Sequence, residues 1–283
     1  MRACCDRCAA RRRSGMASAH PAHVGTLGDY AVDRELPGAP GETCVEVTHR
    51  VLPRRARLRV ARDRDAGIRL MREACILEAL RHPGVPGVFE IGVADGMPWI
   101  ADELVIGEPL AAPIAVEQIV LVLRDACTIL AHLHRRGVIH DGIWLDAFVR
   151  RDDGGERGMC LTNWTRARIG EPELGKTDVY ALGTAIYAAL PGSAPLGVVE
   201  LVDRMVAPDP DRRPSAAEVA REATRLAEVA GGFDDPEIEE VILLTDLSRE
   251  LPVQLGKPKW TPAPAMTIPP ATGAPIALLK QRP

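Results

Sequence analysis

The sequence lacks any long hydrophobic run and any surplus of basic residues. Its apolar stretches, such as Val241–Leu244, fall far short of the ~18 residues that a membrane-spanning helix needs, so no span is expected. The formal net charge is −4, which gives no basic excess for binding nucleic acid. The N-terminal leader contains no apolar segment typical of a secretory signal peptide, so a cytoplasmic location is expected.

A second pair of metal-spaced cysteines is also lacking. Cys5 and Cys8 have the Cys-x-x-Cys spacing, but a structural zinc site needs four ligands and no matching pair follows. We therefore predict no metal site. A metal-binding or adaptor role for the leader stays as an alternative, which deletion of residues 1–15 would test. The other cysteines lie singly in apolar segments, as buried thiols do: Cys44, Cys75, Cys127 and Cys160.

The composition predicts a globular centre with irregular ends. Apolar residues make up 46% and charged residues 26% of the chain, close to the average for folded domains. Residues 1–26 form a Cys- and Arg-rich leader that we expect to be disordered. Residues 231–283 are rich in proline and are expected to be a mostly disordered tail. The fold is then expected within residues 27–104 and 105–230.

Hydrophobic periodicity predicts strands in the first half of this region and helices in the second. The expected strands are Thr43–Val47, Ala56–Val60, Gly87–Val93 and Trp99–Leu104, interrupted by a helix over Ile68–Leu80. The expected helices of the second half are Val116–Arg136, Asp178–Ala189, Val198–Val206 and Ser215–Val229, with a short strand pair within Ala147–Thr162. Ser215 and Glu218 have the spacing of a capping box. The predicted class is α+β.

Four local segments narrow this class. They are Arg72–Ala74 with Leu80–Val85, Gly137–His140, Thr177–Gly183 and Asp209–Ala216. In this order they resemble the helix-C region, the approach to the catalytic loop, the buried F helix and the closing C-lobe segment of bacterial-type protein serine/threonine kinases. The resemblance implies a bilobal protein-kinase-like fold, with a small β-rich N-lobe containing one helix and a mainly α-helical, shortened C-lobe.

The resemblance also implies where phosphate-binding residues should stand. In an ungapped alignment, the three loop glycines of the family become Pro37, Ala39 and Glu42, whereas a shifted loop would use Gly38 and Gly41 instead. Proline removes a backbone donor, and Glu42 would bring negative charge beside a triphosphate. Arg59 takes the place of the strand lysine, and its planar fork is not equivalent to an ammonium group. Glu73 keeps the helix-C carboxylate, so we expect an Arg59–Glu73 ion pair.

The base-binding side of the pocket is altered as well. Arg57 stands where the family has a small residue against adenine, and Asp102 falls at the gatekeeper position before the hinge-like Glu103 and Val105. Our hypothesis is that Asp102 pairs with Arg57 or Arg59 and that these charges plug a degenerate nucleotide pocket. The alternative is two solvated arginines on an edge strand.

The catalytic loop can be aligned in two registers. Without gaps, Gly142 stands at the catalytic aspartate, Ala147 at the magnesium-binding asparagine, and Trp144 at the loop lysine. With one residue deleted after His140, Asp141 becomes the base and Asp146 a metal ligand. The ungapped register is favoured, because it puts apolar residues at the family's apolar positions.

Both registers place Asn163 at the magnesium-binding aspartate of the Asp-Phe-Gly motif. Asparagine is a weaker ligand for a hard dication than a carboxylate. The segment from Asn163 to Glu173 is also short for a regulated activation loop.

The sequence therefore predicts a pseudokinase that acts as a signalling scaffold or regulator by binding a protein partner. No cofactor is expected. The alternative is a divergent ATP-dependent protein serine/threonine kinase that uses Asp141, Asp146 and Arg59, and this alternative alone would require ATP and magnesium.

Overall fold

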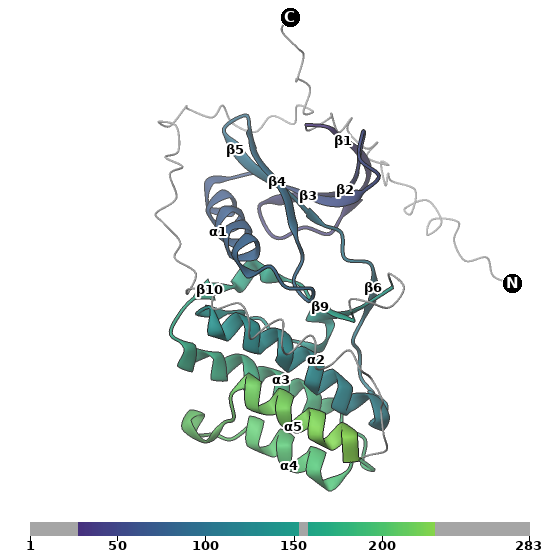
Figure 1. Ribbon diagram of the computed structural model, residues 1–283. Helices are drawn as coiled ribbons and strands as arrows, with labels where there is room; N and C mark the ends of the chain where they lie inside the picture. Colours follow the sequence, from purple (N-terminus) through teal and green to yellow (C-terminus); the bar gives the residue numbers. More distant parts are fainter. Residues whose placement is uncertain (1–27, 153–157, 230–283) are drawn as a thin grey trace, which may run out of the picture.

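A computed structural model of the chain describes residues 28–152 and 158–229, which form two lobes (Figure 1). The N-lobe contains a five-stranded antiparallel sheet in the order β1-β2-β3-β5-β4. Its strands are β1 (Tyr30–Leu36), β2 (Glu42–His49), β3 (Arg55–Ala61), β4 (Val88–Ala94) and β5 (Met97–Glu103). The central position of β3 puts its side chains against both neighbouring strands.

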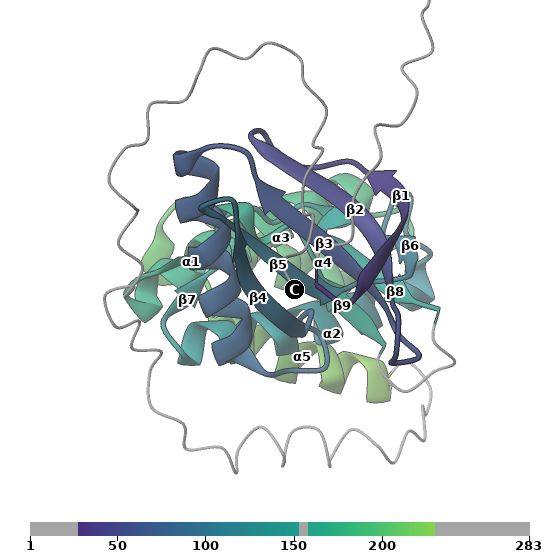
Figure 2. The same cartoon turned by 90° about the horizontal axis from the view of Figure 1, so that it is seen from above.

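Helix α1 (Arg64–Leu80) packs beside this sheet, as the view from above shows (Figure 2). The side chain of Asp63 caps the helix by accepting a hydrogen bond from the backbone N–H of Ala66 at 2.8 Å. Leu70 and Ala74 of α1 bury against Ile100 of β5. Because strand side chains alternate between faces, Trp99 falls on the opposite face. There it packs with Tyr30 and Val47 in a separate cluster.

Four helices build the C-lobe: α2 (Val116–Arg135), α3 (Gly175–Ala189), α4 (Leu196–Met205) and α5 (Ala216–Val229). They stack below the N-lobe in Figure 1 and enclose the largest apolar core of the described region. The predicted capping box precedes α5. The Ser215 backbone N–H donates to Glu218 Oε2 at 2.8 Å, and the Glu218 N–H donates back to Ser215 Oγ at 3.3 Å.

Short strands and turns between these helices form the C-lobe surface that faces the sheet. The strands are β6 (Gly107–Pro109), β7 (Val138–Ile139), β8 (Phe148–Arg151), β9 (Met159–Leu161) and β10 (Arg168–Ile169). The 3-10 turns are η1 (Leu145–Ala147), η2 (Trp164–Arg166), η3 (Pro172–Leu174) and η4 (Pro210–Arg212). β7 pairs with β10, and β8 lies between β6 and β9.

The predicted α+β class and bilobal, kinase-like architecture are confirmed. Strand β1 was not predicted. None of the helices within residues 28–152 and 158–229 has the length and apolarity that a bilayer crossing requires. The predictions for the leader (1–26) and for the tail (231–283) fall on residues that the structure does not describe.

Candidate functional site

A cavity of about 410 Å³ lies between the lobes, and we call it the cleft cavity. Its N-lobe wall is the loop from Pro37 to Pro40 with residues of β2, β3 and α1, and its C-lobe wall is the segment 162–165. Arg59, Glu73 and Asn163, which the sequence predicted in a degenerate nucleotide pocket, are three of the side chains that line it. Its volume is within the usual range for small-molecule sites.

Arg57, which lines this cavity, forms a two-pronged ion pair with the buried Asp102. Arg57 Nε donates to Asp102 Oδ1 at 2.8 Å, and Arg57 Nη2 donates to Asp102 Oδ2 at 2.9 Å. β3 and β5 are paired with Arg57 opposite Asp102, so the sheet register itself brings the two side chains together. Planar guanidinium and carboxylate groups match in this arrangement, which fixes both orientations.

Arg59 connects this pair to helix α1. Its Nη2 lies 2.7 Å from Asp102 Oδ2 and 2.8 Å from Glu73 Oε1. Burial lowers the pKa of Arg59, but Asp102 and Glu73 more than offset this effect, and its pKa is raised overall. Burial likewise raises the pKa of Asp102, and the charges of Arg57 and Arg59 outweigh it and lower that pKa. Arg59 and Asp102 are therefore both ionised at neutral pH.

The predicted Arg59–Glu73 and Arg57–Asp102 contacts are confirmed, and the alternative of solvated arginines on an edge strand is wrong. β3 is a central strand of the sheet. The Arg59 side chain is only 5% exposed, and the Asp102 side chain is fully buried. The sequence could not decide this point because the position of a strand within a sheet depends on long-range pairing.

Glu42 also faces the cleft cavity, but its carboxylate is poorly partnered. Its side chain is 1% exposed, and its nearest cation is Arg59, whose Nη1 lies 3.9 Å from Oε2. Neither Glu42 oxygen accepts a hydrogen bond. Burial raises the pKa of Glu42, against the opposing influence of Arg59. Sequence reasoning noted the negative charge of Glu42 but not its isolation.

The sheet surface above the cavity is polar. Glu42 and Cys44 share one face of β2, and the register pairs them with Ala61 and Arg59 of β3. Cys44 and Arg57 are both among the residues that line the cavity. An aromatic base binds best against apolar side chains, whereas this wall offers a thiol and an ion-paired guanidinium group.

On the C-lobe side, Asp178 of α3 holds the backbone of the catalytic-loop region. Its carboxylate accepts hydrogen bonds from the backbone N–H groups of His140 and Asp141, each at 2.9 Å. His134 Nε2 lies 3.0 Å from the same carboxylate. These contacts fix the loop where it enters the cleft, independently of any side chain that performs chemistry.

The two aspartates of the gapped register lie apart from the cleft cavity. Asp141 has a φ of 56°, and its carboxylate is 3.4 Å from Arg168 Nε and 3.9 Å from Arg166 Nη2. Asp146 is exposed on η1. Neither residue is among those that line the cavity. The ungapped candidates carry no acidic group, since they are Gly142 and the buried Ala147.

Asn163 adopts the left-handed conformation, with φ 63° and ψ 56°. Asparagine tolerates this conformation better than most residues, so the backbone at this position needs no glycine. Its Oδ1 accepts a hydrogen bond from Thr165 Oγ1 at 3.3 Å. The next residue, Trp164, is buried, donates its indole N–H to the Leu161 carbonyl at 2.8 Å and packs edge-on against His140.

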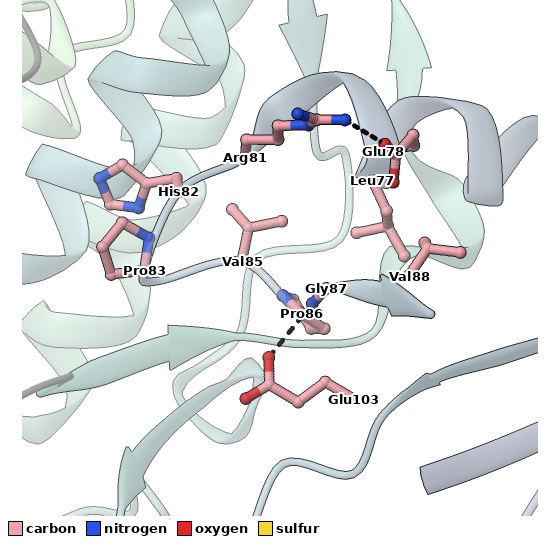
Figure 3. Close-up of a pocket in the computed structure, with 10 residues that line it drawn as sticks. All are labelled: Leu77, Glu78, Arg81, His82, Pro83, Val85, Pro86, Gly87, Val88 and Glu103. Carbon is pink, nitrogen blue, oxygen red and sulfur yellow. Dashed lines mark hydrogen bonds and ion pairs between the residues drawn. The ribbon is translucent and has the colours of Figure 1, made fainter. Parts of the chain in front are cut away.

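The hinge-like residues Glu103 and Val105 do not line the cleft cavity. Glu103 lines a second cavity of about 550 Å³, formed by the end of α1, the loop 81–87 and the start of β4 (Figure 3). Its Oε2 accepts a hydrogen bond from the Gly87 backbone N–H at 3.1 Å, and its Oε1 lies 2.6 Å from Arg151 Nη1. Val105 is half-buried beyond the end of β5 and lines neither cavity. The second cavity was not predicted.

Within the described ranges, no group of three or more His, Cys, Asp or Glu side chains is arranged to hold a metal ion. In the C-lobe, Arg213 Nε donates to the Ala207 carbonyl at 2.7 Å, and the guanidinium group lies over the ring of Tyr180.

Comparison with known proteins finds several bacterial kinases whose sequences are similar to this chain. The chain is 30% identical over 215 residues to the serine/threonine-protein kinase PknJ of Mycobacterium tuberculosis, covering 62% of this chain and 36% of the relative. It is 24% identical over 253 residues to PkaA of Streptomyces coelicolor (69% and 45%). It is 31% identical over 170 residues to PknB of Mycolicibacterium smegmatis (48% and 27%), also a serine/threonine-protein kinase.

The matched region thus spans less than half of the length of each of these relatives. No protein-family model matches the chain. The sequence matches and the two-lobed α+β architecture agree with each other, and both support a relationship of this chain to the bacterial serine/threonine protein kinases.

Proposed function

We propose that this protein is a pseudokinase, which acts as a signalling scaffold or regulator by binding another protein. The observation that carries the proposal is the buried network of Arg57, Asp102, Arg59 and Glu73 at the wall of the cleft cavity. Phosphoryl transfer needs a free cation for the phosphates, a carboxylate for the attacking hydroxyl and carboxylate or amide ligands for magnesium. The cations in this network are already paired.

The remaining positions support the same proposal. Gly142 and Ala147 have no side chain that could orient a hydroxyl or bind magnesium, and Asn163 offers a neutral oxygen. A β-carbon at Gly142 would meet only ordinary contacts, the nearest at 3.6 Å from Arg166. Glycine is therefore not required there by packing. ATP and magnesium do not fit the residues present.

The divergent-kinase alternative uses Asp141 and Asp146. Magnesium-dependent transfer of phosphate from ATP to the protein itself or to a general protein substrate tests it. The pseudokinase proposal predicts no transfer above that of a heat-inactivated control. Transfer that Asp141→Asn abolishes, and that Asp203→Asn on the exposed face of α4 does not affect, would establish the alternative instead.

The proposal also includes a cytoplasmic location and a protein partner in a signalling pathway. Cys44, Cys75, Cys127 and Cys160 are free thiols, which fits a reducing compartment. The kinases that match the chain suggest signalling as its setting.

A further inference from the structure

The charges around the cleft cavity do not balance. Two guanidinium groups, Arg57 and Arg59, face three carboxylates, those of Asp102, Glu73 and Glu42. Asp102 binds both arginines at 2.9 Å or less, and Glu73 binds Arg59 at 2.8 Å. Of these five side chains only Glu42 lacks a close partner, and the five together carry one negative charge when all are ionised, with Arg69 of α1 as a further cation that acts on Glu42.

An ionised carboxylate that is buried without a hydrogen bond is costly. Both Glu42 oxygens are buried and accept no hydrogen bond, although the side chain borders a cavity of about 410 Å³. A buried carboxylate normally gains charge-assisted hydrogen bonds or a cation to offset the loss of water. A ligand that donates hydrogen bonds and carries positive charge would supply both.

The rest of the lining indicates what kind of cation fits. Pro37, Ala39 and Pro40 border the cavity opposite Trp164 and Thr165. These residues offer apolar contact for a carbon stem. A divalent metal ion would need several more oxygen ligands than Glu42 alone, because Glu73 already binds Arg59. The volume also exceeds that of a single ion, and an organic cation can fill it.

We propose that the cleft cavity binds an organic cation, a guanidinium or ammonium group on an apolar stem, and that Glu42 is its charged acceptor. This inference rests on the proposed function, since it gives the cleft a ligand other than nucleotide. The cation is either the side chain of an arginine or lysine of the protein partner or a free small amine. Both sources would present the same kind of positively charged group to Glu42.

The loop geometry supports a preformed site. The Arg69 side chain of α1 donates to the Pro40 carbonyl at 2.7 Å, and the Gly41 carbonyl accepts from the Arg62 N–H at 2.8 Å. Gly41 has a φ of 80°, and a β-carbon there would lie 2.5 Å from Asp63 Oδ2. Glycine is thus required at this turn, and the turn fixes the position of Glu42 at the start of β2, beside the cavity.

Calorimetric titration of the full chain tests the inference with two probes. One is agmatine, a small guanidine, and the other is a blocked peptide with one arginine among glycines and serines. The same peptide with citrulline in place of arginine is the uncharged control. We expect saturable binding of agmatine, of the arginine peptide or of both, and at least about tenfold weaker binding of the citrulline peptide. Peptide binding alone would identify the source as a protein side chain, and agmatine binding alone a free amine.

Glu42→Gln locates the site, because it keeps the shape and removes the charge. We expect it to weaken cation binding about tenfold or more. Glu46→Gln is the matched control, since Glu46 lies on the same face of β2 but binds Arg34 and Arg55 outside the cavity. It should leave the affinity unchanged within about twofold. Equal loss in both variants, or no loss in Glu42→Gln, would overturn the inference.

The pH dependence gives an independent readout. Cation binding requires ionised Glu42, which Arg59, Arg57 and Arg69 favour and Glu73 opposes. Affinity should therefore fall as the pH drops through the pKa of Glu42, which burial raises, and this dependence should vanish in Glu42→Gln. If neither probe binds the wild-type chain, this inference fails while the pseudokinase proposal stands. Tight binding of magnesium-ATP would contradict that proposal separately.

Discussion

On the C-lobe side of the cleft, the contacts that hold the backbone match what a kinase-like fold requires. Asp178 binds two backbone N–H groups of the loop at His140 and Asp141, and Trp164 packs against His140. On the N-lobe side, side chains that would serve a nucleotide are instead bound to one another around Asp102. The contacts that hold the catalytic-loop backbone and the paired charges of the nucleotide side thus occupy separate positions, as the pseudokinase proposal expects.

The largest expected effect comes from breaking the N-lobe network. Asp102→Ala would leave Arg57 and Arg59 without their shared carboxylate in a buried site. We expect a loss of about 3–5 kcal/mol in the free energy of unfolding, measured by urea denaturation. Asp203→Ala on exposed α4 is the control and should change it by less than about 0.5 kcal/mol. A loss below about 1 kcal/mol for Asp102→Ala would mean that the network is not structurally important.

Asp178→Ala tests the C-lobe side in the same assay. It would leave the backbone N–H groups of His140 and Asp141 without their acceptor. Each unsatisfied buried group costs about 1–3 kcal/mol, and because the Asp141 amide is only partly buried we expect a loss of about 2–4 kcal/mol. Hydrogen exchange should become faster at these two amides. Unchanged exchange would contradict the role assigned to Asp178.

A pH series separates histidine effects from those of the carboxylate network. Burial and the neighbouring His132 lower the pKa of His82 to about 3, whereas its unfolded value is near 6.5. The unfolded chain therefore binds a proton that folded His82 does not, and stability falls as the pH drops below about 6.5. At pH 5 this one residue should cost about 2 kcal/mol.

His82→Asn should reduce the change in the free energy of unfolding between pH 7 and 5 by about 2 kcal/mol, because asparagine does not titrate. The lowered pKa of Asp102 places its own contribution at lower pH, where stability is lost as that carboxylate becomes protonated. If the free energy of unfolding of His82→Asn depended on pH as it does in the wild-type chain, other groups would cause any loss of stability between pH 7 and 5.

The smallest expected effect is at Trp144, which stands at the loop-lysine position and is 67% exposed. Trp144→Ser should change the free energy of unfolding by less than about 0.5 kcal/mol. The buried Trp164 is its matched counterpart, and Trp164→Ala should cost about 3–5 kcal/mol. Similar losses for the two variants would remove the distinction between positions that hold the fold and positions that the fold does not need.

The sequence predicted the long elements well because their periodicity is local. Helix α1 and strands β2, β3 and β5 were expected within a few residues of their bounds. β1 was missed because Tyr30–Leu36 carries three charged residues and an irregular pairing between Val32 and Arg34, which breaks the alternation of a strand. Its place is set by pairing with β2 rather than by its own pattern.

One part of the site could also be predicted from local sequence patterns. The pairing of Arg57 with Asp102 followed from strand period and the kinase resemblance. The isolation of Glu42 depends on the turn at Gly41 and on which partners Arg59 selects, and no local pattern specifies either. The second cavity arises from the path of loop 81–87 and the contact of Glu103 with Arg151, two residues 48 positions apart in sequence.

The central claim is that the cleft does not bind nucleotide as an active kinase does. A thermal-shift titration of the full chain with ATP, with and without magnesium, tests it most directly. The account predicts little or no shift in Tm at millimolar ATP in either condition, because the cations that would bind phosphate are paired with Asp102 and Glu73. A saturable, magnesium-dependent rise in Tm at micromolar ATP would contradict it.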